Sequence, residues 1–136
     1  MLAVVDTGPL YASLDRDDAD HKACAAALSR PGLRMVIPML VIAEVAYLAA
    51  TRLGANVEAA FIQALGTLDV DSPPPREWTR IAELVRQYAD FPLGTTDASV
   101  VALAERLGTL NVITLDRRHF HAVRPLHCEA LQLLPE

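Results

Sequence analysis

The chain has 136 residues, of which 52% are hydrophobic, and its 17 acidic and 12 basic side chains give a net charge of −5. That length suits one domain, residues 1–136, with a core of its own, and it excludes two large domains. The apolar content excludes an intrinsically disordered chain. The acidic balance argues against a module that binds nucleic acid through an excess of positive charge.

The cysteine content and the N-terminal sequence bear on the compartment. Cys24 and Cys128 are the only cysteines, too few for a disulfide-stapled secreted domain, so we expect a reducing cytoplasm. The chain reaches Asp6 without the basic region of a signal peptide. The apolar segment 35–51 contains Pro38 and Glu44 and is shorter than a typical span, so we expect no membrane association.

Short apolar runs alternate with helical stretches along the chain. The first half is predicted to contain a strand at 2–5, a helix from about residue 10, a helix at 21–29, a strand at 33–37, helices at 39–53 and 57–65, and a strand at 68–70. The second half is predicted to contain helices at 76–88 and 97–107 and strands at 111–115 and 130–134. This alternation is typical of an α/β protein whose parallel sheet carries helices on both faces.

Two carboxylates end predicted strands. Asp6 follows the apolar run 2–5, and Asp116 closes the run 111–115. Parallel sheets bind ligands at the carboxyl ends of their strands, where the strand order reverses. Each aspartate taken alone is equally compatible with a turn or a helix cap.

Two further carboxylates lie in helices. The helical neighbours of Glu44 include Val41 and Tyr47 and are mainly apolar, which predicts that Glu44 lies on the packed face. An unpaired buried carboxylate costs several kcal/mol, so Glu44 needs either a bound cation or an arginine partner. Asp97 is the only charged residue in 93–104 and lies in a first helical turn, where capping is the alternative role.

The fold class could bring these four acids into one crevice. Clustered carboxylates repel and raise one another's pKa, and a hard divalent cation such as Mg²⁺ or Mn²⁺ relieves that repulsion. Zn²⁺ is less favoured, because the sequence places no His or Cys beside any of the four, and the C-terminal histidines match no standard zinc spacing. Such a site suits phosphodiester hydrolysis. The alternative is a non-catalytic protein-interaction module in which the acids are structural.

The chain resembles the PIN-domain nucleases, specifically the VapC-type toxins of bacterial toxin–antitoxin pairs. Each motif alone is weak, but their order and spacing are specific and extend over nearly the whole chain. The motifs are Val5-Asp6-Thr7, Pro38-x5-Glu44-x2-Tyr47-Leu48, Tyr88-x-Asp90, Thr96-Asp97-Ala98-Ser99 and Thr114-x-Asp116-x3-Phe120.

This resemblance implies a PIN-like α/β/α sandwich with a parallel sheet of about five strands. It implies a homodimer with Mg²⁺-dependent endoribonuclease activity on structured RNA of the tRNA or rRNA class. It also implies a cognate antitoxin protein whose tail covers the site.

The resemblance further implies roles for individual residues. The acidic tetrad of the family maps onto Asp6, Glu44, Asp97 and Asp116, and these four are the expected metal ligands. Residues expected to support them are a fifth acid, Asp90, and three hydroxyls, Thr7, Ser99 and Thr114. Independently of the resemblance, Arg117 and Arg118 directly follow Asp116, where they either contact RNA phosphates or form a solvated turn.

Overall fold

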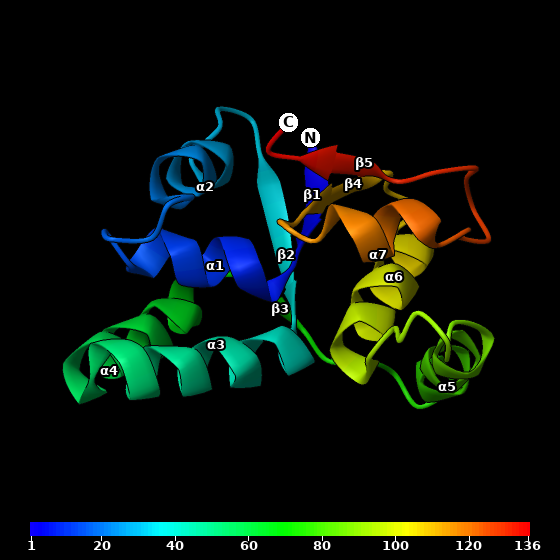
Figure 1. Ribbon diagram of the computed structural model, residues 1–136, viewed down its shortest axis with the longest axis horizontal. Coiled ribbons are helices and arrows are strands. Elements are labelled where there is room, and N and C mark those ends of the chain that lie inside the picture. The colour runs from blue at the N-terminus through cyan, green and yellow to red at the C-terminus, as the bar shows by residue number, and fades with distance from the viewer.

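A five-stranded, all-parallel sheet forms the centre of the computed structural model, which describes residues 1–136 (Figure 1). The strand order is β3-β2-β1-β4-β5. The strands are β1 (Leu2–Val5), β2 (Arg34–Pro38), β3 (Val70–Asp71), β4 (Asn111–Ile113) and β5 (Gln132–Leu134). The expected parallel sheet of about five strands is therefore confirmed.

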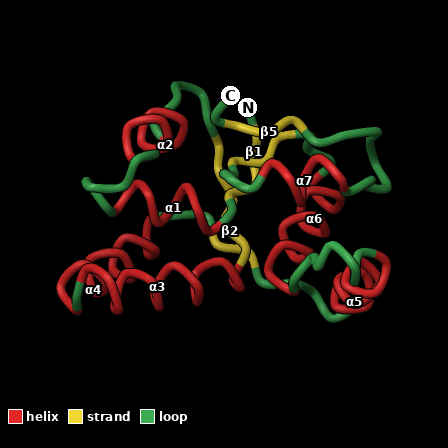
Figure 2. The backbone as a smooth tube through the Cα atoms, viewed as in Figure 1, coloured by secondary structure: helices red, strands yellow, loops and turns green.

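Helices cover both faces of this sheet. Figures 1 and 2 show α1 to α4 on one side of the strands and α5 to α7 on the other. The helices are α1 (Thr7–Leu14), α2 (His21–Leu28), α3 (Met39–Leu53), α4 (Ala55–Ala64), α5 (Glu77–Gln87), α6 (Thr95–Leu107) and α7 (Arg117–Ala122), with a 3-10 turn at Leu65–Thr67. None of them is long and apolar enough to cross a membrane.

Strand β1 is the middle of the sheet and the point at which the strand order reverses. Val4 pairs with Val36 of β2 on one side, and Val5 pairs with Ile113 of β4 on the other. These side chains are fully buried or nearly so, as expected for a sheet covered on both faces. The carboxyl ends of β1 and β4 consequently lie side by side at the edge where parallel sheets bind ligands.

Helix α6 is the most deeply packed helix. Its residues from Ala98 to Ala104 are all buried, and it contacts α5 on one side and the sheet on the other. Helix α3 instead buries one face, formed by Val41, Val45 and Ala49, a spacing of four residues that follows the helical repeat. The ordered start of α6 is what fixes the position of Asp97.

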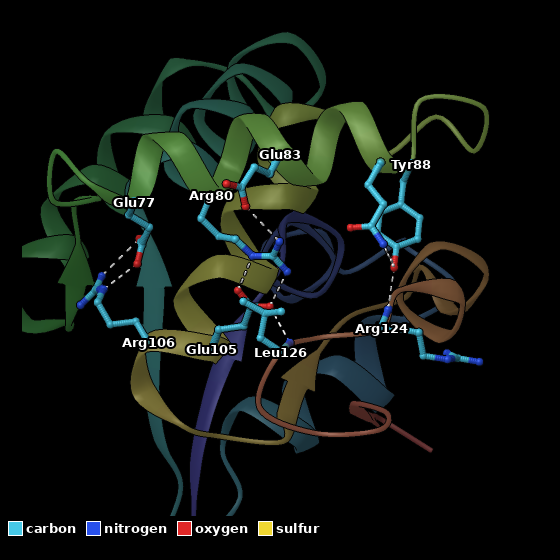
Figure 3. A network of polar contacts seen from close by, with 9 residues as sticks. Glu77, Arg80, Glu83, Tyr88, Glu105, Arg106, Arg124 and Leu126 are labelled. Atoms are coloured by element: carbon cyan, nitrogen blue, oxygen red, sulfur yellow. Dashed lines mark hydrogen bonds and ion pairs between the residues drawn. The ribbon is translucent and has the colours of Figure 1, made fainter.

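A network of ion pairs joins α5 to α6, and we call its members Glu77, Arg80, Glu83, Glu105 and Arg106 the α5–α6 network (Figure 3). The guanidinium of Arg80 donates from Nε and Nη2 to the two carboxylate oxygens of Glu105, both at 2.8 Å. Arg106 donates to Glu77 at 2.7 Å and also contacts Asp71. Every carboxylate in this network therefore touches an arginine.

The loop after α7 is attached to the same region. The backbone N–H of Leu126 donates to Glu105 Oε2 at 2.9 Å, and the backbone N–H of Arg124 donates to the Tyr88 hydroxyl at 2.8 Å (Figure 3). These bonds hold the connection between α7 and β5 against α5 and α6.

The sequence missed one helix, α7. It has six residues and buries one side chain, Phe120, so it shows no apolar periodicity. Its start is fixed by a cap, since the Asp116 carboxylate accepts a hydrogen bond from the backbone N–H of His119 at 3.0 Å. Of the two alternatives for Arg117 and Arg118, the solvated turn does not describe the backbone, which is helical, although both side chains are exposed.

Candidate metal centre

Four elements bring Asp6, Glu44, Asp97 and Asp116 together, and we call these residues the acidic cluster. Asp6 directly follows β1, and Asp116 lies between β4 and α7. Asp97 is in the first turn of α6, and Glu44 is in the second turn of α3. The negative charges of the other three all raise the pKa of Asp97, so the four carboxylates lie close enough to repel one another.

Thr114 connects the two aspartates at the strand ends. Its hydroxyl donates to Asp6 Oδ2 at 2.7 Å and accepts from the backbone N–H of Asp116 at 3.0 Å. Thr114 and Asp6 are 1% and 6% exposed, so this link lies in the interior. The side chain of one residue therefore sets the spacing between the two carboxylate-bearing ends of β1 and β4.

Glu44 is held by two hydroxyls from other elements. Thr7, at the start of α1, donates to Glu44 Oε1 at 3.1 Å, and Thr96, at the start of α6, donates to Oε2 at 2.8 Å. The expectation that Glu44 lies on the packed face is wrong, because its side chain is exposed. Val41 and Val45 point into the core, and the α-helical repeat turns Glu44 away from them toward the edge of the sheet.

Asp97 is the one member of the cluster whose carboxylate accepts no hydrogen bond. The N-terminus of α6 has no side-chain cap either, because the N-cap residue is Gly94, which has no side chain to accept a hydrogen bond. Burial, followed by the charges of Asp6 and Asp116, raises the pKa of Asp97 from 3.8 to about 7. A partly buried carboxylate that accepts no hydrogen bond is the one that a bound cation would stabilise most.

Burial also raises the pKa of Asp6 above its usual value. The hydrogen bonds from Thr114 and from the Thr7 backbone oppose this rise, and the charges of Asp116 and Glu44 add to it. The cluster therefore holds more negative charge than its own hydrogen-bond donors stabilise.

His119, on α7, is a member of the site that the sequence did not reveal. Its Nδ1 lies 2.6 Å from Asp116 Oδ2 and its Nε2 lies 3.1 Å from the backbone carbonyl oxygen of Phe91, and the imidazole donates to both acceptors when it is protonated. The hydrogen bond with Asp116 raises the pKa of His119, and the Phe91 carbonyl adds to that rise. The expectation that no histidine lies beside the four acids is wrong. The signal in the sequence is the i, i+3 spacing of Asp116 and His119, which becomes visible once α7 is known to be helical.

The donor atoms fit a hard divalent cation. One ligand atom each from Asp97, Asp116 and His119 lie within 4.8 Å of one another. Both ring nitrogens of His119 are engaged with hydrogen-bond acceptors, so the free donors of the site are carboxylate oxygens. Oxygen ligands suit Mg²⁺ or Mn²⁺ better than Zn²⁺.

Asp90 and Ser99 were expected to support the cluster, but neither forms a hydrogen bond with its carboxylates. Asp90 is exposed in the turn after α5, and no hydrogen bond or ion pair connects it to the four acids. The Ser99 hydroxyl is buried and donates to the backbone carbonyl of Thr96 at 2.6 Å, so it holds no carboxylate. Thr7 and Thr114 do donate to carboxylates of the cluster.

The arginines after Asp116 differ from each other. The Arg118 guanidinium lies 5.6 Å from the centre of the Phe91 ring, and Phe91 packs edge-on against His119. Arg117 donates to the backbone carbonyl of Pro135.

The C-terminal histidines and cysteine do not gather into a zinc site, because His127 Nε2 donates to the Thr109 carbonyl at 2.7 Å, away from His119.

Comparisons with known proteins identify the family and the fold. The model of the PIN domain family matches residues 3–125. Ribonuclease VapC26 of Mycobacterium tuberculosis (strain ATCC 25618 / H37Rv) is 34% identical over 134 residues, which cover 97% of this chain and 99% of that protein.

Solved structures share the fold. The crystal structure of VapC20 of M. tuberculosis, described as a sarcin-ricin loop cleaving toxin, has a TM-score of 0.73 at 20% identity and covers 81% of this chain and 86% of its own. VapBC2 from Rickettsia felis, bound to a DNA fragment from its promoter, has a TM-score of 0.70 at 14% identity and covers 98% of both chains. VapBC-1 from nontypeable Haemophilus influenzae has a TM-score of 0.65 at 19% identity and covers 88% and 90%. On the family match and the VapC26 identity together, the chain belongs to the PIN-domain family and is a relative of the VapC ribonucleases.

Proposed function

We propose that this protein is a Mg²⁺-dependent endoribonuclease that hydrolyses phosphodiester bonds in structured RNA, with Mn²⁺ as a substitute ion. The observation that carries the proposal is the acidic cluster, in which four carboxylates lie close together, a histidine contacts only Asp116, and Asp97 accepts no hydrogen bond. The ribonuclease name of the 34% identical relative supports the same activity. Such a cluster is unfavourable without a cation, so its presence at the ligand-binding edge of the sheet favours a metal-binding role.

The roles of the residues follow from their contacts. Asp6, Glu44, Asp97 and Asp116 would hold the metal through carboxylate oxygens. Bound Mg²⁺ supplies an activated water and stabilises negative charge on the scissile phosphate. Hydrogen bonds to a ligating carboxylate fix its orientation, and this is the role of the hydroxyls of Thr7, Thr96 and Thr114. Asp90 and Ser99 are left out of this assignment because they do not contact the cluster.

Arg118 is the arginine that we propose to contact an RNA phosphate. It is exposed, forms no ion pair, and stacks on Phe91, which packs against His119 at the cluster. Arg117 is exposed as well, but its guanidinium already contacts the Pro135 carbonyl. Phosphate contacts of this kind position RNA without reading its sequence. We therefore expect the target, of the rRNA or tRNA class, to be selected by RNA shape.

We further propose a cognate antitoxin, supported by the two neighbours that are VapBC structures. An apolar groove of about 590 Å³ between α1, α2 and α4 offers a surface for an antitoxin segment with apolar side chains, and Leu14, Leu28 and Phe61 are among the residues that line it. Ala60, exposed at its edge, gives the test: Ala60→Arg is expected to weaken antitoxin binding and to leave RNA cleavage unchanged.

We also propose that the protein is a homodimer and lies in the cytoplasm. Tyr47 and Trp78 are 68% and 45% exposed, which leaves large apolar side chains for a second copy to cover. Both cysteines are free thiols, as expected in a reducing compartment. Sedimentation equilibrium of the purified chain distinguishes a monomer from a dimer.

The activity is tested with purified protein and total cellular RNA. We expect cleavage with Mg²⁺, no cleavage after EDTA, and loss of cleavage in Asp6→Asn, which keeps the shape of the side chain and removes its charge. Asp90→Asn is the matched control, because Asp90 is an exposed acid outside the cluster. Equal cleavage by Asp6→Asn and the wild type, or none by the wild type with either metal, would support the protein-interaction module instead.

A further inference from the structure

We propose that His119 is a positioning residue that fixes the Asp116 carboxylate for cation binding by tying it to the backbone of Phe91. The inference rests on the proposed metal-dependent function and adds a residue that the acidic tetrad does not include. It is carried by hydrogen bonds that join three segments: the end of β4, helix α7 and the loop before α6.

The first step is the way in which Asp116 is held. Its Oδ1 accepts the backbone N–H of His119 at 3.0 Å, and its Oδ2 accepts His119 Nδ1 at 2.6 Å. One residue therefore donates to both oxygens of the same carboxylate. Two donors on different oxygens fix the plane of a carboxylate, and a ligand with a fixed plane loses less entropy when it binds a cation.

The second step is the anchor of the imidazole ring. His119 Nε2 lies 3.1 Å from the Phe91 carbonyl oxygen, within hydrogen-bond distance, and the Phe91 ring meets the imidazole edge-on with centres 5.6 Å apart. Arg118 covers Phe91 at 5.6 Å, and Leu93, two residues further on, is 2% exposed. The ring is thus attached to a segment that is itself anchored in the core.

The third step links the two acids that face each other. The anchored segment leads directly into α6, where Asp97 lies in the first turn. Through His119, the position of Asp116 is therefore set relative to the start of α6. A cation shared by Asp97 and Asp116 would depend on this spacing, and ligand atoms of the two lie within 4.8 Å of each other.

The same contacts argue against His119 as a metal ligand. A ligating imidazole nitrogen must present a free lone pair, but Nδ1 and Nε2 of His119 both face acceptors, a carboxylate and a carbonyl. The geometry therefore favours a residue that orients a ligand over one that binds the ion.

Two substitutions separate the two arms of this clamp. The amide nitrogen of Asn occupies approximately the place of Nδ1, so His119→Asn keeps the donor to Asp116 and loses the one to Phe91. The amide nitrogen of Gln occupies approximately the place of Nε2, so His119→Gln keeps the donor to Phe91 and loses the one to Asp116. His121→Gln is the matched control, an exposed histidine on the same helix.

The readout is Mn²⁺ binding to the metal-free protein, followed by electron paramagnetic resonance without RNA. We expect His119→Gln to weaken Mn²⁺ binding by about 10- to 100-fold, as for other groups that orient ligands. His119→Asn is expected to fall between His119→Gln and the wild type, and His121→Gln to match the wild type. Urea unfolding of each variant shows that the fold is retained.

Three results would overturn the inference. Unchanged Mn²⁺ affinity in His119→Gln would show that the contact with Asp116 does not matter. Equal losses in the Asn and Gln variants would indicate a general structural role. Nitrogen coupling from an imidazole to bound Mn²⁺ in the wild type would make His119 a ligand. Failure of the wild type to bind Mn²⁺ at all would overturn the proposed metal-dependent function itself, which separates the two failures.

Discussion

The α5–α6 network and the acidic cluster differ in how their carboxylates are paired. In the α5–α6 network each acid touches an arginine, as Glu105 does with Arg80 and Glu77 does with Arg106. In the acidic cluster no acid is paired with an arginine, a histidine contacts only Asp116, and Asp97 accepts no hydrogen bond. Paired charges hold two helices together, whereas clustered charges of the same sign repel one another and would weaken the fold unless a cation neutralised them. The contrast indicates which region serves the fold and which serves the chemistry.

The largest expected effect comes from neutralising the acid without a donor. Asp97→Asn keeps the shape of the side chain and removes one of four clustered charges. We expect RNA cleavage to fall by more than about 100-fold, because changes to groups that merely orient ligands already cost about 10- to 100-fold. The same substitution is expected to raise the melting temperature of the metal-free protein, since it relieves repulsion. A cleavage assay and a thermal melt in EDTA measure the two effects, and lower stability in EDTA would contradict the proposed repulsion.

Removing a positively charged side chain from the α5–α6 network should lower the stability of the fold and leave metal binding unchanged. Arg80→Leu leaves Glu105, whose side chain is 10% exposed, without its bidentate partner. We expect a loss of roughly 2–4 kcal/mol in the free energy of unfolding, as for other broken ion pairs of low exposure. Urea denaturation measures the loss. Mn²⁺ affinity of the folded variant should stay at the wild-type value, and a parallel loss of affinity would show that the two regions are coupled.

The pH dependence of the stability of the metal-free protein should show the repulsion in the acidic cluster, with a smaller effect than the two substitutions above. The pKa of Asp97 is about 7 in the folded chain and near 3.8 when unfolded, so between these values the folded protein binds a proton that the unfolded chain has released. The contribution of Asp97 to stability is therefore present below about pH 4 and is lost as the pH rises toward 7. The stability gain of Asp97→Asn over the wild type should be greater at pH 8 than at pH 5. Urea titrations in EDTA at both values test this, and an equal gain would refute it.

The smallest expected effect concerns an ion pair outside both regions. Arg34 contacts Asp69 at 3.3 Å with side chains that are 73% and 48% exposed. Arg34→Ala should change the free energy of unfolding by less than about 1 kcal/mol, because water and salt screen such pairs. Comparing it with Arg80→Leu shows how much of the stabilisation depends on burial.

Much of the fold could be predicted from the sequence because the strands and longer helices carry strong patterns. The apolar run at Leu2–Val5 marked the central strand, and Gly108 marked the end of α6. The same logic placed Asp6 and Asp116 at one edge of the sheet, since parallel strands end together. The structure places them there, and Thr114 connects them.

Two features could not be predicted from the sequence: the short helix α7 and the side of α3 that faces the core. Helix α7 has one buried side chain, so no periodicity indicates it, and without it His119 could not be placed beside Asp116. Glu44 has apolar neighbours on its helix, but Tyr47 is 68% exposed, so those neighbours do not define a buried face. Which side of a helix meets the core is decided by packing, which a single sequence does not specify.

The position of Asp116, late in a chain whose central strand comes first, has a consequence for synthesis. A polypeptide that ends after α6 would contain Asp6, Glu44 and Asp97 but not β4, so one edge of β1 would have no neighbour. The fourth carboxylate enters the cluster only after β4 has been synthesised and has paired with β1. The proposed metal site is therefore completed only after the central strand and the other three acids have been made.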